Sequence, residues 1–172
     1  HGYVEEAGQV MFSDGGSDAV GGPQLPFDYE HMMFTRDVDY ASAACWVTRR
    51  SVFRSLGGFD LAYAPAYFED SDLAFTARSC GLVTRLVVDR PVGHAHATAT
   101  AGRVALAERS RKIFQTKWAE VLQSQPTRLL SGEDLARIIL EPDSVAYQQQ
   151  NSGKKLSELL VRVDSAYSSR VL

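Results

Sequence analysis

The chain has 172 residues, of which 45% are hydrophobic and 23% are charged, as expected for one globular domain with a core of its own. Its net charge of −3 and its pI of about 5.8 argue against a nucleic-acid partner, because binding nucleic acid usually requires a basic patch and a high pI. No apolar run approaches the roughly 20 residues of a membrane span.

The first part of the chain predicts two strands separated by a loop. Residues 9–12 are typical of a short strand. Residues 13–26, SDGGSDAVGGPQLP, are rich in glycine and proline and predict a long loop. Residues 38–47 are small and apolar on both faces, which favours a buried strand.

Two helices are predicted in the middle of the chain. The stretch RRSVFRSL has helical apolar spacing and ends at the pair Gly57 and Gly58. The apolar residues from Leu73 to Cys80 also keep helical spacing, and Gly81 stands where a left-handed C-terminal residue is common.

The later elements become less distinct toward the C-terminus. Residues 82–88 predict a β-branched strand, and VGHAHATATAG at 92–102 predicts a second short strand that fades into a loop of small residues. Residues 103–123 carry an apolar stripe and predict a long helix that stops before a proline. Two weaker amphipathic segments, 133–140 and 154–163, flank a polar linker.

An acidic stretch follows two aromatic residues at the start of the second helix. Tyr67 and Phe68 run directly into Glu69, Asp70 and Asp72. Acids are favoured at a helix N-terminus, where the free N–H groups and the macrodipole attract negative charge. A carboxylate fixed there also makes a good general base, and the stretch alone leaves both interpretations open.

Several segments together resemble one enzyme family. EEAGQVMFSDG, VDYASAACWVTRRSVFRSLGGFD, YAPAYFEDSDLAFTARSCG, VGH and RKIFQTKW occur in this order. The set resembles the second half of bacterial family 2 glycosyltransferases of O-antigen and surface-polysaccharide synthesis, over about residues 3–122. We therefore divide the chain into an acceptor-side half over 1–125 and a helical tail or linker over 126–172.

The resemblance implies the C-terminal part of a GT-A fold, an α/β architecture. In this part we expect a short mixed sheet flanked by helices, within a mostly parallel sheet of the whole fold, and a C-terminal helical tail. Such an enzyme moves a sugar from a nucleotide-sugar donor to a saccharide acceptor, here with inversion. The resemblance assigns the catalytic base to Asp70, with Glu69 beside it.

The same resemblance proposes further binding residues. Tyr67 and Phe68 would stack on a sugar, although rings at a helix start are often core. His94 corresponds to a histidine near the metal and the diphosphate, and a loop histidine without a role is the alternative. Arg111 and Lys117 match the family pattern and would meet the diphosphate, although a basic helical face is usually only solvated.

The chain lacks the N-terminal half that the resemblance requires. That half would hold Mg²⁺ or Mn²⁺ through an Asp-x-Asp motif; the strings at 37–39 and 70–72 lie at other positions, and we expect neither to bind the ion. Because the chain opens with HGYVEEAGQV and not with Met, we expect it to be a portion of a longer protein. Because the donor-binding half is absent, we expect this portion to be inactive by itself and to bind no metal.

Two further expectations concern partners and location. A half-domain exposes sheet edge and apolar surface, which predicts association with the missing half or a homodimer. The alternative to an enzyme is a non-catalytic interaction or oligomerisation module derived from the same fold. Cys45 and Cys80 form no Cys-x-x-Cys pair of the kind that binds zinc, and free thiols fit a reducing compartment. We expect a cytoplasmic location, with the inner face of the membrane as the alternative.

Overall fold

The computed structural model describes residues 4–20, 34–88, 92–94 and 102–128. The helices predicted over 133–140 and 154–163 lie outside the described residues, as does nearly all of the predicted tail. Within the described residues no helix is both long and apolar enough to cross a membrane. Of the strand predicted within residues 92–102, residues 92–94 have no regular structure, and residues 95–101 lie outside the described residues.

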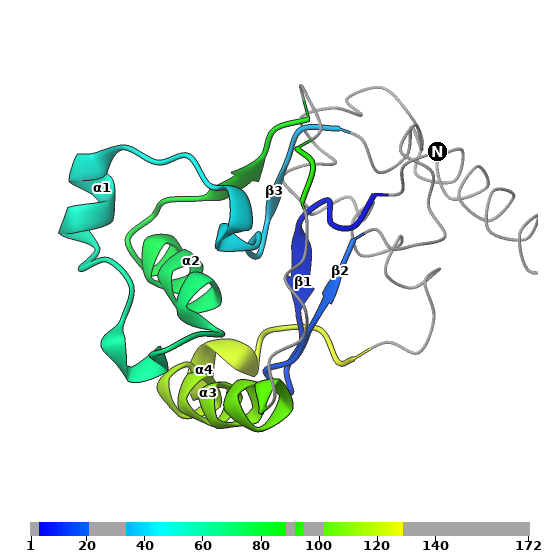
Figure 1. The fold of residues 1–172 in the computed structure, drawn as a ribbon, viewed down its shortest axis with the longest axis vertical. Coiled ribbons are helices and arrows are strands. Elements are labelled where there is room, and N and C mark those ends of the chain that lie inside the picture. Colours follow the sequence, from blue (N-terminus) through cyan, green and yellow to red (C-terminus); the bar gives the residue numbers. More distant parts are fainter. Residues whose placement is uncertain (1–3, 21–33, 89–91, 95–101, 129–172) are drawn as a thin grey trace, which may run out of the picture.

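In the described residues, four short strands form two antiparallel pairs, β1 with β2 and β3 with β4. The strands are β1 (Gln9–Met11), β2 (Ser17–Ala19), β3 (Arg36–Val38) and β4 (Thr84–Leu86). An isolated bridge between Gln9 and Tyr40 joins β1 to the segment that follows β3. The two pairs therefore lie next to each other, as Figure 1 shows.

The antiparallel pairing differs from the short mixed sheet that the resemblance implies. β1 and β2 are joined by a tight turn, and a tight turn connects only antiparallel neighbours. β3 and β4 are joined by a connection that contains two helices, so its length does not dictate their direction. The mostly parallel sheet of the GT-A fold stays a prediction for the fold as a whole.

The turn between β1 and β2 explains why a strand lies inside the predicted loop. Phe12 N–H donates to the Gly16 carbonyl at 2.8 Å, and Gly15 N–H donates to the Phe12 carbonyl at 2.9 Å. Gly15 has a φ of +67°, a conformation that glycine adopts without a Cβ clash. The glycine-rich stretch therefore reverses the chain quickly, and β2 follows within it.

The buried strand predicted over 38–47 is wrong for most of its length. Only Val38 belongs to a strand, and Ala43–Cys45 form the short 3-10 helix η1. The Ser42 hydroxyl accepts a hydrogen bond from Ala44 N–H and caps this turn. The small residues of this stretch fit the pattern of a buried strand. A serine among them, however, can bond to a nearby backbone N–H and so favours a local turn.

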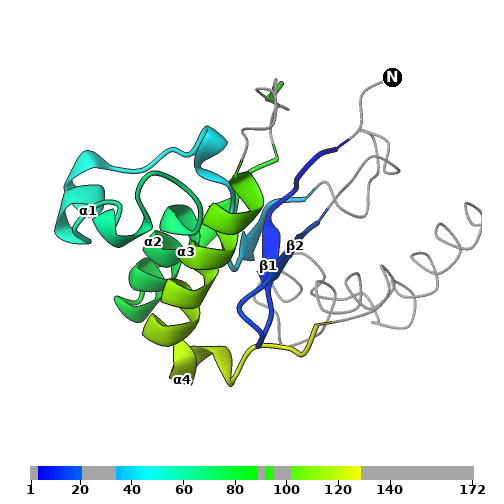
Figure 2. The ribbon, with the colours of Figure 1, turned by 60° about the horizontal axis from the view of Figure 1, so that its bottom comes forward.

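The helices predicted near 50–56, 69–80 and 103–123 are confirmed with small changes. They are α1 (Arg50–Ser55), α2 (Glu69–Ser79), α3 (Arg103–Lys117) and α4 (Ala119–Leu122), and a second 3-10 helix, η2, covers Leu61–Tyr63. The last predicted helix is divided at Trp118, whose φ of −110° interrupts helical geometry. Figures 1 and 2 show α1, α2 and α3 on one side of β1 and β2.

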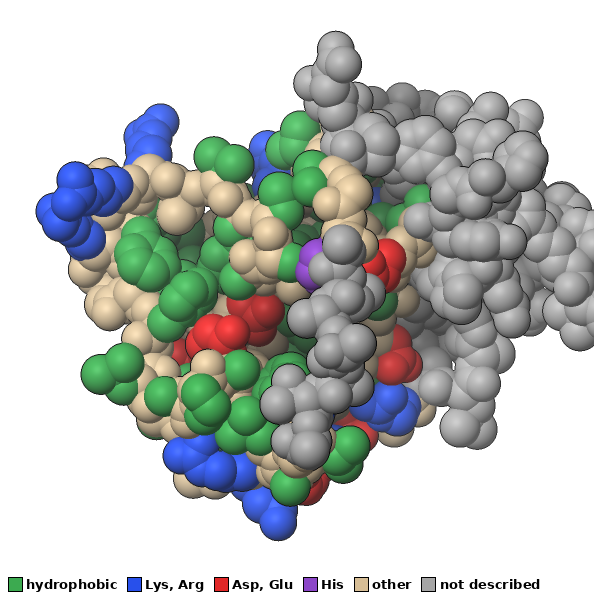
Figure 3. Space-filling view, in the orientation of Figure 1, with side chains coloured by type: hydrophobic (Ala, Val, Ile, Leu, Met, Phe, Trp, Pro, Cys, Tyr) green, Lys and Arg blue, Asp and Glu red, His purple; other side chains and the backbone are tan. Residues whose placement is uncertain are grey.

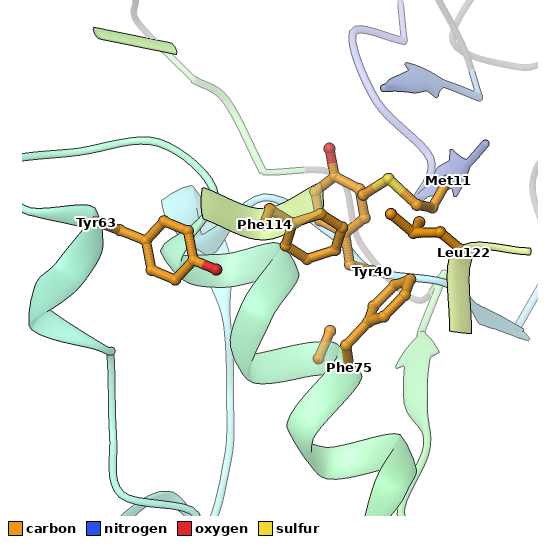
Figure 4. Packing of buried hydrophobic residues seen from close by; sticks show 7 residues of the cluster. Met11, Tyr40, Tyr63, Phe75, Phe114 and Leu122 are labelled. Atoms are coloured by element: carbon orange, nitrogen blue, oxygen red, sulfur yellow. The ribbon is translucent and has the colours of Figure 1, made fainter. Parts of the chain in front are cut away.

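The core lies between the strands and α2 and α3. It is formed by Met11, Tyr40, Tyr63, Ala74, Phe75, Phe114 and Leu122, most of which are labelled in Figure 4. The Phe114 ring of α3 lies 5.1 Å from Phe75 of α2 and 5.4 Å from Phe68, measured between centroids. These ring contacts fix the start of α2 against α3.

Candidate functional site

The turn that leads into α2 has an unusual backbone. Tyr67 and Phe68 both have positive φ, at +77° and +70°. Two successive non-glycine residues in the left-handed region cost roughly 1–3 kcal/mol each, and such strain concentrates at functional sites. Phe68 is the N-cap of α2, so the strained turn sets the direction in which the acidic residues enter the helix.

Asp70 lies in the first turn of α2 with a fixed carboxylate. One carboxylate oxygen, Oδ2, accepts a hydrogen bond from Ala43 N–H at 3.2 Å. The other, Oδ1, accepts one from Ser71 N–H at 2.7 Å. The side chain is half-buried, and backbone N–H donors orient it. Such a carboxylate is both held in place and accessible, as a general base must be.

Glu69 precedes Asp70 and is also half-buried. Its Oε2 is buried and has no hydrogen-bond partner in the described part of the chain. Burial raises the pKa of the Glu69 carboxyl above its usual range, and the nearby charge of Asp70 adds to the rise. Glu69 therefore retains its proton to higher pH than an exposed glutamate would.

A second carboxylate approaches Asp70 through adjacent backbone groups. Ser42 N–H donates to Glu6 Oε1 at 2.7 Å, and the next residue, Ala43, donates to Asp70. Neighbouring N–H groups of one short segment thus bind Glu6 and Asp70. The residues before β1 and the start of α2 form one acidic site, although they are far apart in the sequence.

The buried ring of Tyr40 lies at the bottom of this site. Its hydroxyl lies 2.5 Å from Ser17 Oγ and donates to Gln9 Oε1 at 2.7 Å. Burial, together with the charges of Asp70 and Glu6, raises the pKa of Tyr40 to about 12. Tyr40 is therefore a neutral hydroxyl at physiological pH that connects the acidic site to the β1–β2 pair.

The two aromatic residues before α2 have different surroundings. The Phe68 ring packs on Phe114 of the core, as the core alternative predicted. The Tyr67 ring has the Arg103 guanidinium 5.8 Å from its centroid, at the start of α3. The Tyr67 ring therefore lies beside a cation of α3 and not in the core cluster.

Lys117 forms ion pairs within the chain. Its ammonium lies 2.8 Å from Asp72 Oδ2 and 3.0 Å from Asp60 Oδ2. Partial burial lowers the pKa of Lys117, but the hydrogen bonds and charges of both carboxylates outweigh it and raise that pKa overall. Asp72 also accepts hydrogen bonds from Trp118 Nε1 at 2.8 Å and the Tyr63 hydroxyl at 3.1 Å. Lys117 thus joins α3 to α2 in the described chain.

Arg111 holds the turn between β1 and β2. It donates to the Asp14 carbonyl at 2.7 Å and lies 3.0 Å from the Asp14 carboxylate. Gln115 of α3 donates to the same carbonyl at 2.7 Å, and Arg128 lies 3.1 Å from the same carboxylate. Arg111 is therefore engaged on the hairpin side of α3, with Asp14 as its partner.

His94 and the Asp-x-Asp strings have ionic partners of their own. His94 Nδ1 lies 3.5 Å from Glu5 Oε2 at an exposed position. Asp37 pairs with Arg85 at 2.7 Å, and Asp39 pairs with Arg78 at 2.6 Å. Within the described residues no group of three or more His, Cys, Asp or Glu side chains is placed to hold a metal ion.

On the surface, the acidic site lies among apolar side chains. Figure 3 shows acidic side chains exposed beside the start of α2, with hydrophobic side chains on either side. The geometry therefore places Glu69 and Asp70 side by side at the start of α2 and the Tyr67 ring beside Arg103, and it places Lys117 and Arg111 in structural contacts.

Sequence reasoning missed Glu6 and Tyr40. The only signal for Tyr40 was a hydroxyl-bearing ring inside the small apolar run VDYASAAC, and a tyrosine in such a run usually keeps a hydrogen-bond partner. Nothing local relates Glu6 to Asp70. Their proximity depends on how the segment around Ser42 passes between them.

The chain was compared with known proteins in three ways. No family model, no curated protein and no solved structure matches it. The functional interpretation therefore rests on the geometry of the site and on the motifs in the sequence.

Proposed function

We propose that this chain is the acceptor-side portion of a family 2 glycosyltransferase with a GT-A fold, and that Asp70 is its catalytic base. The observation that carries the proposal is the half-buried Asp70 carboxylate, oriented by Ala43 N–H at the start of α2. It lies directly after two residues with left-handed backbone, where strain favours a functional role.

Inverting sugar transfer requires one general base from this half of the enzyme. The acceptor hydroxyl gives its proton to Asp70 while its oxygen forms a bond to the anomeric carbon of the donor sugar. The bond between that carbon and the nucleotide diphosphate breaks on the opposite face, so the configuration inverts. General-base catalysis of this kind contributes about 10²–10⁴-fold.

Glu69 and Tyr67 would serve the acceptor. The half-buried Glu69 carboxyl beside Asp70 would bind a sugar hydroxyl. The Tyr67 ring offers an apolar face, with Arg103 beside it. Because the described residues offer no metal ligand set, we assign no step to a metal in this portion.

The test replaces Asp70 in a protein that contains both halves. Asp70→Asn keeps the shape of the side chain and removes the base, so kcat should fall at least about 100-fold with little change in the acceptor KM. Asp37→Asn is the matched control, because Asp37 pairs with Arg85 on the exposed β3–β4 sheet. Near-normal transfer by the Asp70 variant would rule out Asp70 as the base.

The exposed apolar side chains favour the alternative, a non-catalytic interaction module. Val47, Val83, Val87 and Val104 are among the exposed large hydrophobic residues of the described chain, and such surface often marks an interface. The two proposals differ in one measurement: only an enzyme would lose sugar transfer through Asp70→Asn. An intact protein without any transfer activity would favour the module.

A further inference from the structure

One segment of the described chain contributes no fully buried side chain, although Trp46 packs against the core from its edge. Residues 41–62 contain η1, α1 and the beginning of η2, yet none of their side chains is buried. Figures 1 and 2 place α1 at the edge of the structure away from β1 and β2. An ordered projection that contributes no buried side chain is a candidate for a binding surface. We refer to residues 46–61 as the tip.

The tip presents apolar side chains to solvent. Val47 is 99% exposed and Leu61 is 86% exposed. Three aromatic rings connect the parts of the tip: Trp46 lies 6.3 Å from Phe59, and Phe53 lies 5.4 Å from Phe59. These ring contacts connect α1 with the loops that precede and follow it. The exposed aliphatic side chains therefore extend from an ordered segment.

The charge of the tip is mostly positive, since Asp60 is its single acidic residue and pairs with Lys117 of α3 at 3.0 Å. Arg49, Arg50 and Arg54 are all exposed, and no acidic residue occurs between Asp39 and Asp60. The whole chain carries −3, so the rest of the molecule is more acidic than this total. Figure 3 shows basic side chains gathered over α1 with hydrophobic side chains next to them.

We propose that the tip docks this chain on an anionic membrane surface. Exposed aliphatic and aromatic side chains together with arginines are the composition of segments that lie in the membrane interface. The arginines bind phosphate headgroups, and Val47, Leu61 and the ring edges enter the boundary of the acyl chains. The acidic remainder is repelled, so docking orients the molecule with α1 toward the lipid.

A membrane fits the tip better than a protein partner does. Arginine and aromatic residues also occur at protein interfaces. Within the tip, however, the one acidic residue, Asp60, pairs with Lys117 of α3, so the three arginines have no acidic counterpart there and their charge is available to an anionic surface. The inference does not depend on sugar transfer, because none of its residues belongs to the acidic site around Asp70.

The test measures co-sedimentation of the full chain with vesicles of phosphatidylglycerol and phosphatidylcholine, compared with phosphatidylcholine alone. We expect binding only to the anionic vesicles, and weaker binding at high salt. Replacing Arg49, Arg50 and Arg54 by Gln should weaken binding roughly fivefold for each arginine. Val47→Ser with Leu61→Ser should also weaken it severalfold.

Matched control variants lie on α3. Val104 is 83% exposed, and Arg103 and Lys112 are exposed cations. Val104→Ser, and Arg103→Gln with Lys112→Gln, should leave binding within about twofold. Circular dichroism of every variant confirms that it is folded. An equal loss in the tip variants and the α3 variants would overturn the proposal.

A spectroscopic measurement locates the contact. Brominated lipids in the anionic vesicles should quench the fluorescence of Trp46, and Trp46→Phe should remove the quenching. Two further results would overturn the proposal: no binding to anionic vesicles at low salt, or a dimer that the tip variants abolish while vesicle binding is absent.

Discussion

Two acids in the first turn of α2 show how the surroundings of a residue decide its role. Asp72 is 3% exposed and accepts hydrogen bonds from Lys117, Trp118 and Tyr63. Asp70, two positions earlier, is half-buried and is held by N–H groups. The hydrogen-bond donors to Asp72 are side chains that join α2 to α3 and to η2, whereas Asp70 keeps access to solvent. Asp72 therefore has a structural role, and Asp70 is suited to act as a general base.

Asp72→Ala should therefore destabilise the chain strongly. The substitution removes the buried anion and leaves Trp118 Nε1 and the Tyr63 hydroxyl without their acceptor. We expect a loss of about 3–5 kcal/mol, measured by urea unfolding. Asp60→Ala is the matched control at the exposed end of the same Lys117, and it should cost about 1 kcal/mol or less. Similar losses for the two variants would contradict a special role for Asp72.

Glu69 predicts a pH dependence of stability. Because burial raises its pKa in the folded state, the folded chain binds this proton more tightly than the unfolded chain does. The resulting stabilisation is complete below the ordinary pKa of 4.5 and is lost as the pH rises through the raised value. Glu69→Gln keeps the neutral form, so it should unfold at a higher urea concentration than the wild type at pH 7.

The difference between Glu69→Gln and the wild type should shrink as the pH falls below 4.5. Unfolding midpoints at several pH values from 4 to 7.5 measure it. Glu108→Gln, an exposed substitution on α3, separates the effect of burial from the loss of one negative charge. A constant difference across the pH range would show that burial of Glu69 has no such effect.

The sequence predicted where α2 begins but not the contacts of the acidic residues at its start. A helix that begins among Glu69, Asp70 and Asp72 follows from local preferences alone, and α2 begins at Glu69. The donor that orients Asp70 comes from Ala43, and the partner of Lys117 comes from α2. Contacts between residues so far apart depend on the packing of whole elements, which no local pattern contains.

At the scale of elements, helices were predicted better than strands for the same reason. The boundaries of α1 and α2 follow from apolar spacing and from glycine stops at 57–58 and 81, which are local signals. Strand pairing is not local: β3 pairs with β4 across α1 and α2. The break at Trp118 also escaped prediction, because it coincides with the hydrogen bond from its indole to Asp72 on another helix.

The entry into β1 depends on a close approach that only glycine permits. Gly8 has a φ of +80°, and a Cβ there would lie 2.5 Å from Val38 Cγ1 of β3. Gly57 has a φ of +90°, but a Cβ there would meet nothing within 4 Å. A side chain at either position would be strained by the positive φ, but only one at Gly8 would also clash with Val38. Comparing the two substitutions therefore separates the cost of the backbone conformation from the cost of the clash.

Gly57→Ala should cost about 1–2 kcal/mol through its left-handed backbone. Gly8→Ala carries that cost and must also displace Val38, which should add about 1–3 kcal/mol. Urea unfolding of both variants measures the difference. Equal losses would mean that β1 and β3 can separate at this point without a penalty.

At the scale of the whole molecule, the described chain leaves much apolar surface uncovered. Val83 and Val87 on either side of β4 are 61% and 64% exposed. Among the described strands β4 pairs only with β3, so its outer edge has backbone groups available to another strand. An edge with exposed valines at both ends is a site for association between chains.

We therefore expect the full chain to self-associate as its concentration rises, through β4. Val83→Lys with Val87→Lys places charges at this edge and should shift the chain toward a monomer in light scattering. Val104→Lys, an equally apolar exposed position on α3, should leave association unchanged. A monomer at high concentration in the unsubstituted chain would show that this edge is already protected, and association that survives the β4 substitutions would place the contact on another surface.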